Sequence, residues 1–445
     1  MRCLGIIAVI IAVLAISRVF QESRARAAAA PASSPGYVTR GDQVESRYRA
    51  YRERLERIHD RLAERVKEFG LELSGKLKAA APQPIPHGYQ ILPRFAADMA
   101  PPAKKPRATS TGFSWPRTER LIEQGYKVLI GLEAQLEEIA GRPGAKRRAA
   151  YEKLIDDFRR LSDGRKLIDA NIQYNRLWQF NIATYKPAYD RQTRLHNAVI
   201  ERQAIFDALG AGDGASFRRA LTGIHGIDSA KERKLLESDL RERDKKLAAE
   251  IDAAAGAFSA PDFVRVEHRQ PHLWIIRVPL YTDIEDLEFV SAFKDAVEKT
   301  WRVRDREDEF GVEIAVAAIS SDRLHHPGAP PRKGDHLDVS RHIALFPADG
   351  ATLTTGAVTT HVLGRAIVLG PHDIAPHVLA HEFGHILGFR DFYFRGYEDL
   401  GGDGYLVMEA IADPNDIMGA PGYGPVLRRH FEKIIQSSTG RELSR

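Results

Sequence analysis

The sequence has almost no cysteine: Cys3 is the only one in 445 residues. A single cysteine excludes an intrachain disulfide and a zinc site built from several thiolates. Any metal ligands must therefore come from histidine and carboxylate side chains. Stability must come from a hydrophobic core, and 445 residues, 43% of them hydrophobic, can supply cores for two or three domains.

The N-terminal apolar run is too short to span a membrane comfortably. Leu4–Ile16 has 13 uncharged residues, whereas a membrane helix needs roughly 20. Arg2 precedes the run, and Ala25-Arg26-Ala27 resembles a signal-peptidase site. We therefore expect residues 1–27 to be a signal peptide and the protein to be exported, either to the periplasm or to the extracellular medium. An uncleaved membrane anchor is the alternative.

A large excess of one charge is missing as well. The formal net charge is +5, and residues 1–27 contribute +3 of it, so the remaining chain carries about +2. Such a small excess does not favour binding to nucleic acid or to a membrane surface. We therefore expect no nucleic-acid partner.

Residues 41–258 have helical periodicity and follow a linker-like segment, 28–40, rich in Ala, Pro, Ser and Gly. Apolar residues recur at steps of three and four from Val44 to Leu77, which predicts a long amphipathic helix over 44–78. Such a helix is typical of a coiled coil, so self-association or a partner protein is expected through it. A Pro-rich tract covers 81–116. Further helices are expected at 121–136, 151–161, 167–178, 187–209 and 229–254.

After Ala260 the pattern changes to short apolar runs, which are typical of strands. A Thr-rich segment, Ala351–Val358, is expected to be an edge strand. Other strands are expected at 273–278, 312–319, 342–346 and 365–369, and helices at 286–301 and 375–387. This order predicts an α/β domain with a mixed sheet over 262–440. The whole chain is therefore expected to be α+β, an all-helical region followed by this domain.

The chemistry-bearing motif is His381-Glu382-Phe383-Gly384-His385, followed by Gly388 and Asp391. Residues four apart lie on the same face of a helix, so His381 and His385 can hold one metal ion. Glu382 follows the first histidine and can reach a water molecule on the metal without being a ligand. Gly388 favours a left-handed helix end, after which the chain can return Asp391 to the metal as the third ligand.

This pattern resembles the signature of the metzincin zinc peptidases, H-E-x-x-H-x-x-G-x-x-H/D. Downstream, Asp416-Ile417-Met418-Gly419 resembles the Met-turn, whose methionine forms the floor beneath the metal in that clan. Most metzincins have histidine as the third ligand, and Asp391 departs from that pattern in the way that snapalysin-like peptidases do. The resemblance covers residues 262–440 and says nothing about 41–258.

The resemblance implies an active-site helix and a zinc-dependent endopeptidase with one catalytic zinc ion. His381, His385 and Asp391 would hold the zinc, and Glu382 would be the general base. The substrate would be an extended protein or peptide segment lying antiparallel to Ala351–Val358. Tyr423, just after the Met-turn, would hydrogen-bond the oxyanion.

Several alternatives for metal binding remain open at this stage. Glu398 or Glu409 could replace Asp391 as the third ligand, as in other H-E-x-x-H enzymes. The acidic loop 399–404 could bind calcium, although a plain loop is the simpler interpretation. Loop histidines could hold a second metal, although solvent exposure is the simpler interpretation for them as well: His325, His326, His336, His342, His361 and His372.

Two alternatives concern the function of the whole chain. The chain could be a helical interaction or scaffold protein that carries a degenerate peptidase domain, although an intact Glu382 argues against degeneracy. The helical region could also be a pro-segment that covers the cleft until it is removed.

Overall fold

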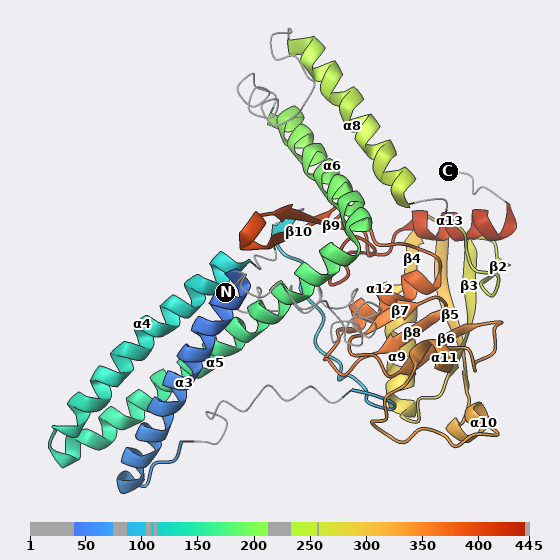
Figure 1. Cartoon of the computed structure of the whole chain (residues 1–445). Helices are drawn as coiled ribbons and strands as arrows, with labels where there is room; N and C mark the ends of the chain where they lie inside the picture. The colour runs from blue at the N-terminus through green and yellow to red at the C-terminus, as the bar shows by residue number, and fades with distance from the viewer. Residues whose placement is uncertain are drawn as a thin grey trace.

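The computed structural model combines a helical N-terminal region with a curled mixed sheet and its helices, which confirms the predicted mixture of α and β structure (Figure 1). The structure describes residues 40–73, 87–103, 108–110, 114–211, 233–255 and 258–440. The predicted signal peptide and residues 28–39 of the predicted linker lie outside the described residues. No helix in these ranges has both the length and the apolar content needed to cross a membrane.

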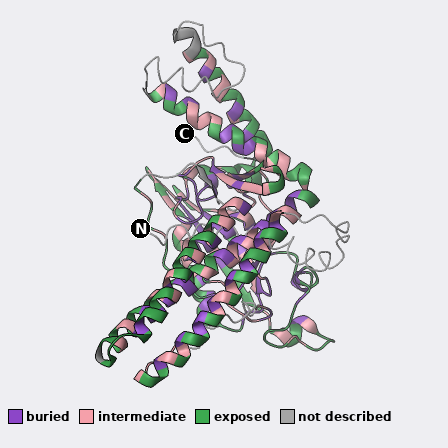
Figure 2. Ribbon diagram, turned by 60° about the vertical axis from the view of Figure 1, so that its left-hand side comes forward, coloured by how far each residue is buried: buried purple, intermediate pink, exposed green. Residues whose placement is uncertain are grey.

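Three long helices form a bundle that extends away from the sheet (Figure 1). They are α3 (Arg40–Val66), α4 (Trp115–Ala140) and α5 (Gly144–Thr184). Apolar residues spaced three and four apart give each helix a buried stripe, visible in purple in Figure 2, and the stripes meet in one core. The helices predicted at 151–161 and 167–178 are two parts of α5.

The helix predicted over 44–78 is shorter than expected. α3 ends at Val66 and is followed by one 3-10 turn, η1 (Lys67–Phe69). Gly70 then takes a φ of +63°, and its N–H donates to the Lys67 carbonyl. This left-handed residue ends the helix, which the apolar spacing alone did not indicate. The apolar stripe of α3 packs against α4 and α5, so the chain itself covers it.

A second pair of helices projects from the sheet domain: α6 (Lys186–Ala211) and α8 (Arg233–Ala255) (Figure 1). Buried leucine, isoleucine and valine side chains pack between them, and ion pairs join their surfaces. These helices confirm the expected segment 187–209 and the described part of the expected segment 229–254, whose residues 229–232 lie outside the described residues.

The sheet of the C-terminal domain has the order β4-β5-β3-β6-β8-β7, with β2 beside β3. Strands β3, β5, β6 and β8 are mutually parallel, whereas β2, β4 and β7 are antiparallel to their neighbours. The strands are β2 (Arg265–Gln270), β3 (Leu273–Thr282), β4 (Arg302–Asp305), β5 (Asp308–Ala318), β6 (Ala351–Thr355), β7 (His361–Leu363) and β8 (Ala366–Leu369). The predicted mixed sheet is confirmed.

Helices cover this sheet and share a core with it. α9 (Leu287–Thr300), α12 (Pro376–Ile386) and α13 (Arg428–Thr439) pack with the strands in the main core of the domain. The shorter α11 (Val339–Ile343) packs with the alternate residues of β8 in a separate small core. A strand whose successive residues enter two cores is buried on both faces, as the apolar run of β8 indicates. α10 (Ser321–His325) is a single turn.

Two strand predictions in this domain are wrong. The apolar run 342–346 begins inside helix α11, because the Asp338 carboxylate accepts a hydrogen bond from Arg341 N and caps the helix. Ala351–Val358 is not an edge strand, because β6 pairs with β3 on one side and with β8 on the other. Its five residues are all buried. The edge strand beyond β8 is β7.

A separate hairpin follows the motif. β9 (Tyr393–Asp399) and β10 (Tyr405–Ile411) pair antiparallel around the 3-10 turn η3 (Gly401–Asp403). β1 (Ala108–Ser110), from the N-terminal region, pairs with the outer edge of β10. Residues 41–258 are therefore not all helical, and their one described strand completes a sheet with residues from the other end of the chain.

The Pro-rich tract also does more than link two helices. Residues 87–103 run along the C-terminal domain, and Phe95 forms a parallel bridge with Ile374. Further along, one Asp98 carboxylate oxygen accepts a hydrogen bond of 2.9 Å from His377 N, in the first turn of α12. The helix-start residue Ala375 provides no side-chain cap of its own. Asp98 therefore caps the helix that carries the H-E-x-x-H motif.

The cap can be tested by replacing Asp98 with alanine. This change leaves a helix N–H without its side-chain acceptor, so we expect the free energy of unfolding of the metal-free protein to fall by about 1 kcal/mol. Urea denaturation measures the difference. Asp262→Ala is the matched control, because Asp262 is exposed and has no described partner, and it should change stability by less than about 0.5 kcal/mol. Equal stabilities for the two variants would contradict the capping role.

Candidate metal centre

Helix α12 places both histidines and the glutamate of the motif in the interior. His381 and Glu382 are buried, and His385 is partly exposed. The two imidazole rings have centroids 4.8 Å apart and planes at 82°. Trp301 helps to fix the helix in place, because its indole N–H donates a hydrogen bond of 2.8 Å to the Ala380 carbonyl. The predicted side-by-side arrangement of the two histidines is therefore confirmed.

Gly388 turns the chain back toward these histidines. Its φ is +101°, a conformation that favours glycine, and an added Cβ would lie 2.5 Å from the Ser259 carbonyl oxygen. After this turn, Asp391 Oδ1 lies 3.2 Å from His381 Nε2 and 3.3 Å from His385 Nε2. One ligand atom from each of the three residues lies within 4.8 Å of the others.

The hydrogen bonds of the histidines orient their free nitrogens inward. His381 Nδ1 lies 2.9 Å from the Ile417 carbonyl oxygen, and His385 Nδ1 lies 2.8 Å from the Phe389 carbonyl oxygen. A carbonyl can only accept, so each Nδ1 donates a proton to its carbonyl and each Nε2 faces the centre, where it can bind a metal ion once it carries no proton. Asp391 Oδ1 is buried there without a hydrogen-bond partner. Two imidazole nitrogens and a carboxylate oxygen are a donor set that suits a divalent metal ion.

Burial and mutual charge shift the pKa values in this group. Burial raises the pKa of Glu382, the nearby histidines oppose this effect, and Asp391 adds to it. Burial alone would lower the pKa of His385, but the Asp391 carboxylate raises it to about 9. Burial opposes ionisation of Asp391, yet the histidines hold its pKa below the usual range. The metal-free centre therefore binds protons that a metal ion would have to displace.

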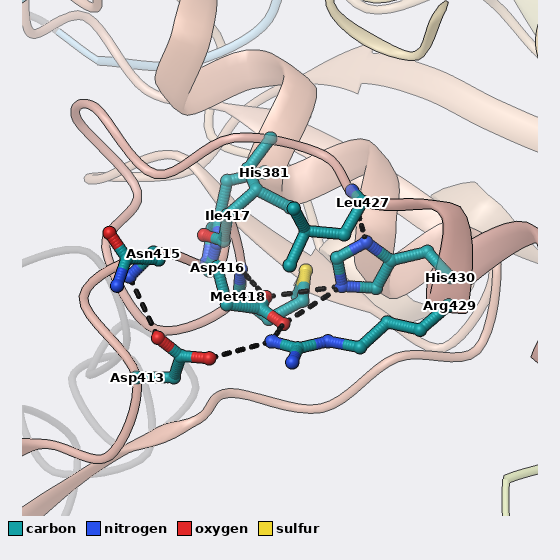
Figure 3. Close-up of polar contacts among 9 residues, drawn as sticks. All are labelled: His381, Asp413, Asn415, Asp416, Ile417, Met418, Leu427, Arg429 and His430. Atoms are coloured by element: carbon teal, nitrogen blue, oxygen red, sulfur yellow. Dashed lines mark hydrogen bonds and ion pairs between the residues drawn. The ribbon is translucent and has the colours of Figure 1, made fainter. Parts of the chain in front are cut away.

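The loop after β10 lies against His381, as Figure 3 shows. Ile417 supplies the carbonyl that orients His381, and Met418 lies next to it with a buried side chain. A Cβ on Gly384 would lie 2.5 Å from Met418 Sδ, so glycine at this position lets the methionine approach the helix. Met418 therefore packs against α12 at Gly384.

Asp416 anchors this loop to α13 (Figure 3). Its carboxylate accepts hydrogen bonds from Met418 N at 2.7 Å, from Arg429 at 2.6 Å and from His430 Nε2 at 3.0 Å. Burial opposes ionisation, but the bond from His430 and its charge lower the pKa of Asp416 to about 2. Sequence reasoning missed His430 and Arg429, because nothing in the local sequence links α13 to the Met418 loop.

Two tyrosines differ in how they relate to the centre. The Tyr423 hydroxyl, predicted to bind an oxyanion, is buried without a hydrogen-bond partner, so it forms no hydrogen bond with His381, His385 or Asp391. Tyr393, which sequence reasoning missed, stacks on the His381 ring with a centroid distance of 6.3 Å. Its position two residues after Asp391 was the available signal.

The structure separates the alternative ligands from the centre. Glu398 is exposed on β9, and Glu409 binds Arg395 through a contact of 3.1 Å. Among the described residues, His381, His385 and Asp391 form the one His and carboxylate group able to hold a metal ion. His377 is a polar neighbour, as its Nε2 donates to the Gly424 carbonyl.

The loop histidines do not form a second group of this kind in the described ranges. His326 and His336 are exposed, as expected. His342 is not: it is buried, and its Nε2 lies 2.9 Å from the Asp283 carboxylate. His325 stacks on it with a centroid distance of 5.2 Å. The expectation of exposure is therefore wrong for His342, because α11 turns it inward.

A comparison of the chain with protein families, curated proteins and solved structures finds no match. The chemistry of the centre must therefore be inferred from its own residues.

Metal binding should depend strongly on pH. Because the raised pKa of His385 keeps this ring protonated in the metal-free protein below about pH 9, a metal ion must displace a proton. We expect the apparent dissociation constant for Zn²⁺ to rise about tenfold for each unit that the pH falls between 8 and 6. Competition with a chelator measures this constant.

Asp391→Asn is the matched comparison for the pH series. It removes the carboxylate that raises the pKa of His385, so metal binding should be weaker and should become less dependent on pH above 7. A wild-type dissociation constant that stays the same from pH 6 to 8 would contradict the assignment of His385.

Proposed function

We propose that the chain is a zinc-dependent endopeptidase of the metzincin type. His381, His385 and Asp391 would hold the zinc ion, and Glu382 would be the general base. The observation that carries this proposal is the convergence of three possible ligand atoms beside Glu382, a buried glutamate on the helix of the two histidines. Export remains part of the proposal and rests on residues 1–27, which are outside the described structure.

Zinc is the proposed metal because of Glu382. Two histidines and one carboxylate also suit non-haem iron, so the ligands alone do not select the ion. A glutamate directly after the first histidine is the arrangement in which a base stands beside, and not on, a hydrolytic zinc ion. When bound, zinc would supply a Lewis acid that polarises a peptide carbonyl and makes water more acidic.

Glu382 has the properties required of the proton carrier. Its carboxylate is buried in the wall of the centre, and burial raises its pKa toward the range in which a carboxylate can both accept and release a proton. It would take a proton from the attacking water as the C–O bond forms. It would then give that proton to the peptide nitrogen as the C–N bond breaks, leaving a carboxylic acid and an amine.

The position of β7 supports an extended substrate. β7 (His361–Leu363) is the terminal strand of the sheet, and α12 packs against both β7 and β8. An extended peptide that pairs with this edge would run beside helix α12, which carries the two histidines. It would be held mainly through main-chain hydrogen bonds. The proposed substrate is therefore a protein or peptide, and β7 takes the role first expected for Ala351–Val358.

Tyr393 is the better candidate to bind the oxyanion. Its ring contacts His381, and the Arg395 guanidinium lies 5.1 Å from the ring centre on the same hairpin. Burial raises the pKa of its hydroxyl, which stays protonated and able to donate a hydrogen bond at neutral pH. Tyr423 shares no such contact with the metal ligands.

The resemblance to the metzincins is supported by three features taken together. Parallel strands and the antiparallel edge strand β7 precede helix α12. Gly388 ends that helix in a left-handed conformation and returns Asp391. Met418 lies under the helix. The third ligand, aspartate in place of histidine, is the departure from the commonest pattern.

Replacing Glu382 with glutamine tests the proposed base. The amide has similar size but cannot accept the proton, so turnover of a general protein substrate should fall at least about a hundredfold while the zinc content stays the same. Elemental analysis and a fluorescent protein substrate provide the two measurements. Glu398→Gln is the control, because Glu398 is exposed and is not a member of the group, and this variant should keep its activity and its zinc. Wild-type turnover by Glu382→Gln would refute the role.

A further inference from the structure

The third ligand is attached directly to the β9–β10 hairpin. Asp391 precedes β9 by two residues, so the position of its carboxylate depends on where the hairpin lies. Phe392 links the two, because its N–H donates to the Met418 carbonyl and its own carbonyl accepts from Ala412 N. A two-stranded hairpin has little stability alone, so other elements must fix its orientation.

Helix α6 covers one face of the hairpin. Phe394 and Ala410 point to this side and pack with Leu195 and Val199 of α6. The closest approach is at Gly396, where an added Cβ would lie 2.8 Å from His196 Cγ. At the next residue of β9, Tyr397, the backbone N–H donates a hydrogen bond of 3.2 Å to Thr193 Oγ1 of α6. The fit between α6 and β9 therefore depends on a glycine at 396.

Helix α5 covers the opposite face. Successive strand residues point to opposite sides, so Tyr397 and its partner Val407 lie on the face opposite Phe394 and Ala410. Val407 packs with Trp178 and Ile182 of α5. The Tyr397 hydroxyl reaches Asp190 in the first turns of α6, at 2.5 Å. The hairpin is thus held between two helices of the N-terminal region, and Figure 1 shows it beside both.

We propose that α5 and α6 position the third metal ligand by holding the β9–β10 hairpin, so that the helical region is a lasting part of the metal centre. Thr193 and His196 of α6 are the positioning residues. This inference rests on the proposed metal site but not on peptide hydrolysis.

The proposal argues against a removable pro-segment. Cleavage near residue 260 would remove α5, α6 and also β1, which pairs with the outer edge of β10. It would also remove Asp98, which caps the metal helix. The start of helix α12 would then lose its cap, and the hairpin after Asp391 would lose the helices and the strand that hold it. Removal of a pro-segment, in contrast, should leave the metal centre complete.

The fit at Gly396 gives a direct test in the full-length chain. Gly396→Ala places a methyl group against His196 Cβ and Cγ, neither of which is a flexible end, so the hairpin must move. We expect the dissociation constant for Zn²⁺ to rise by about ten- to a hundredfold, the usual effect of disturbing the support of a metal ligand. The absorption spectrum of the Co²⁺ form should change at the same time, because the carboxylate ligand is displaced.

Two further variants make the result specific. His196→Ala combined with Gly396→Ala removes the clash and should recover the affinity and the Co²⁺ spectrum of the wild type. Gly402→Ala is the matched control in the hairpin turn, where an added Cβ meets nothing within 4 Å, and it should bind metal normally. If Gly396→Ala does not fold, Thr193→Val takes its place, with weaker Zn²⁺ binding expected because Tyr397 N loses its acceptor.

The outcomes separate this proposal from the proposed function. Wild-type Zn²⁺ affinity and Co²⁺ spectrum in Gly396→Ala, or in the folded Thr193→Val, would overturn the positioning role. A double variant that stays as weak as Gly396→Ala would overturn it too, because the effect would not pass through His196. A wild-type chain that binds Co²⁺ but hydrolyses no peptide would contradict the proposed function and leave the positioning role intact.

Discussion

The structure depends on the return of one carboxylate to two imidazoles. Asp391 Oδ1 lies within 3.3 Å of both Nε2 atoms, in a place where it has no hydrogen-bond partner. Such a group is costly to bury unless a cation compensates for it, and protons or a metal ion can fill that role. Three constraints produce the convergence: the i,i+4 spacing on α12, the left-handed turn at Gly388, and the two backbone carbonyls that orient the rings.

The two parts of the molecule are interlocked around this centre. The N-terminal region contacts helix α12 through Asp98 and the hairpin through α5, α6 and β1. From the other side, Asp416 and His430 tie the Met418 loop to α13, near the C-terminal end. Segments from almost the whole described chain therefore hold a site whose ligands lie within eleven residues of one another. The bundle of α3, α4 and α5 extends beyond these supports (Figure 1). It contacts the hairpin through α5 and also through Arg40 of α3, which forms an ion pair of 2.6 Å with Asp403.

The sequence predicted the centre better than the sheet that surrounds it. His381 and His385 follow from helical spacing, and Asp391 follows from the glycine turn, because these relations are local. The edge of the sheet was wrong because the Thr-rich run of β6 is buried between β3 and β8, and the number of neighbours of a strand is not a local property. The run 342–346 was wrong because Asp338 starts a helix before it. Tyr393, His430 and the contacts of residues 87–103 could not be predicted, since each depends on segments distant in sequence.

The measurement that tests the central claim most directly is X-ray absorption at the zinc edge of the purified full-length protein. The account predicts about one zinc ion per chain, with two imidazole nitrogens at about 2.0–2.1 Å and oxygen donors completing the shell. A protein that takes up no zinc, or a zinc ion with three or more imidazole ligands, would contradict a centre formed by His381, His385 and Asp391.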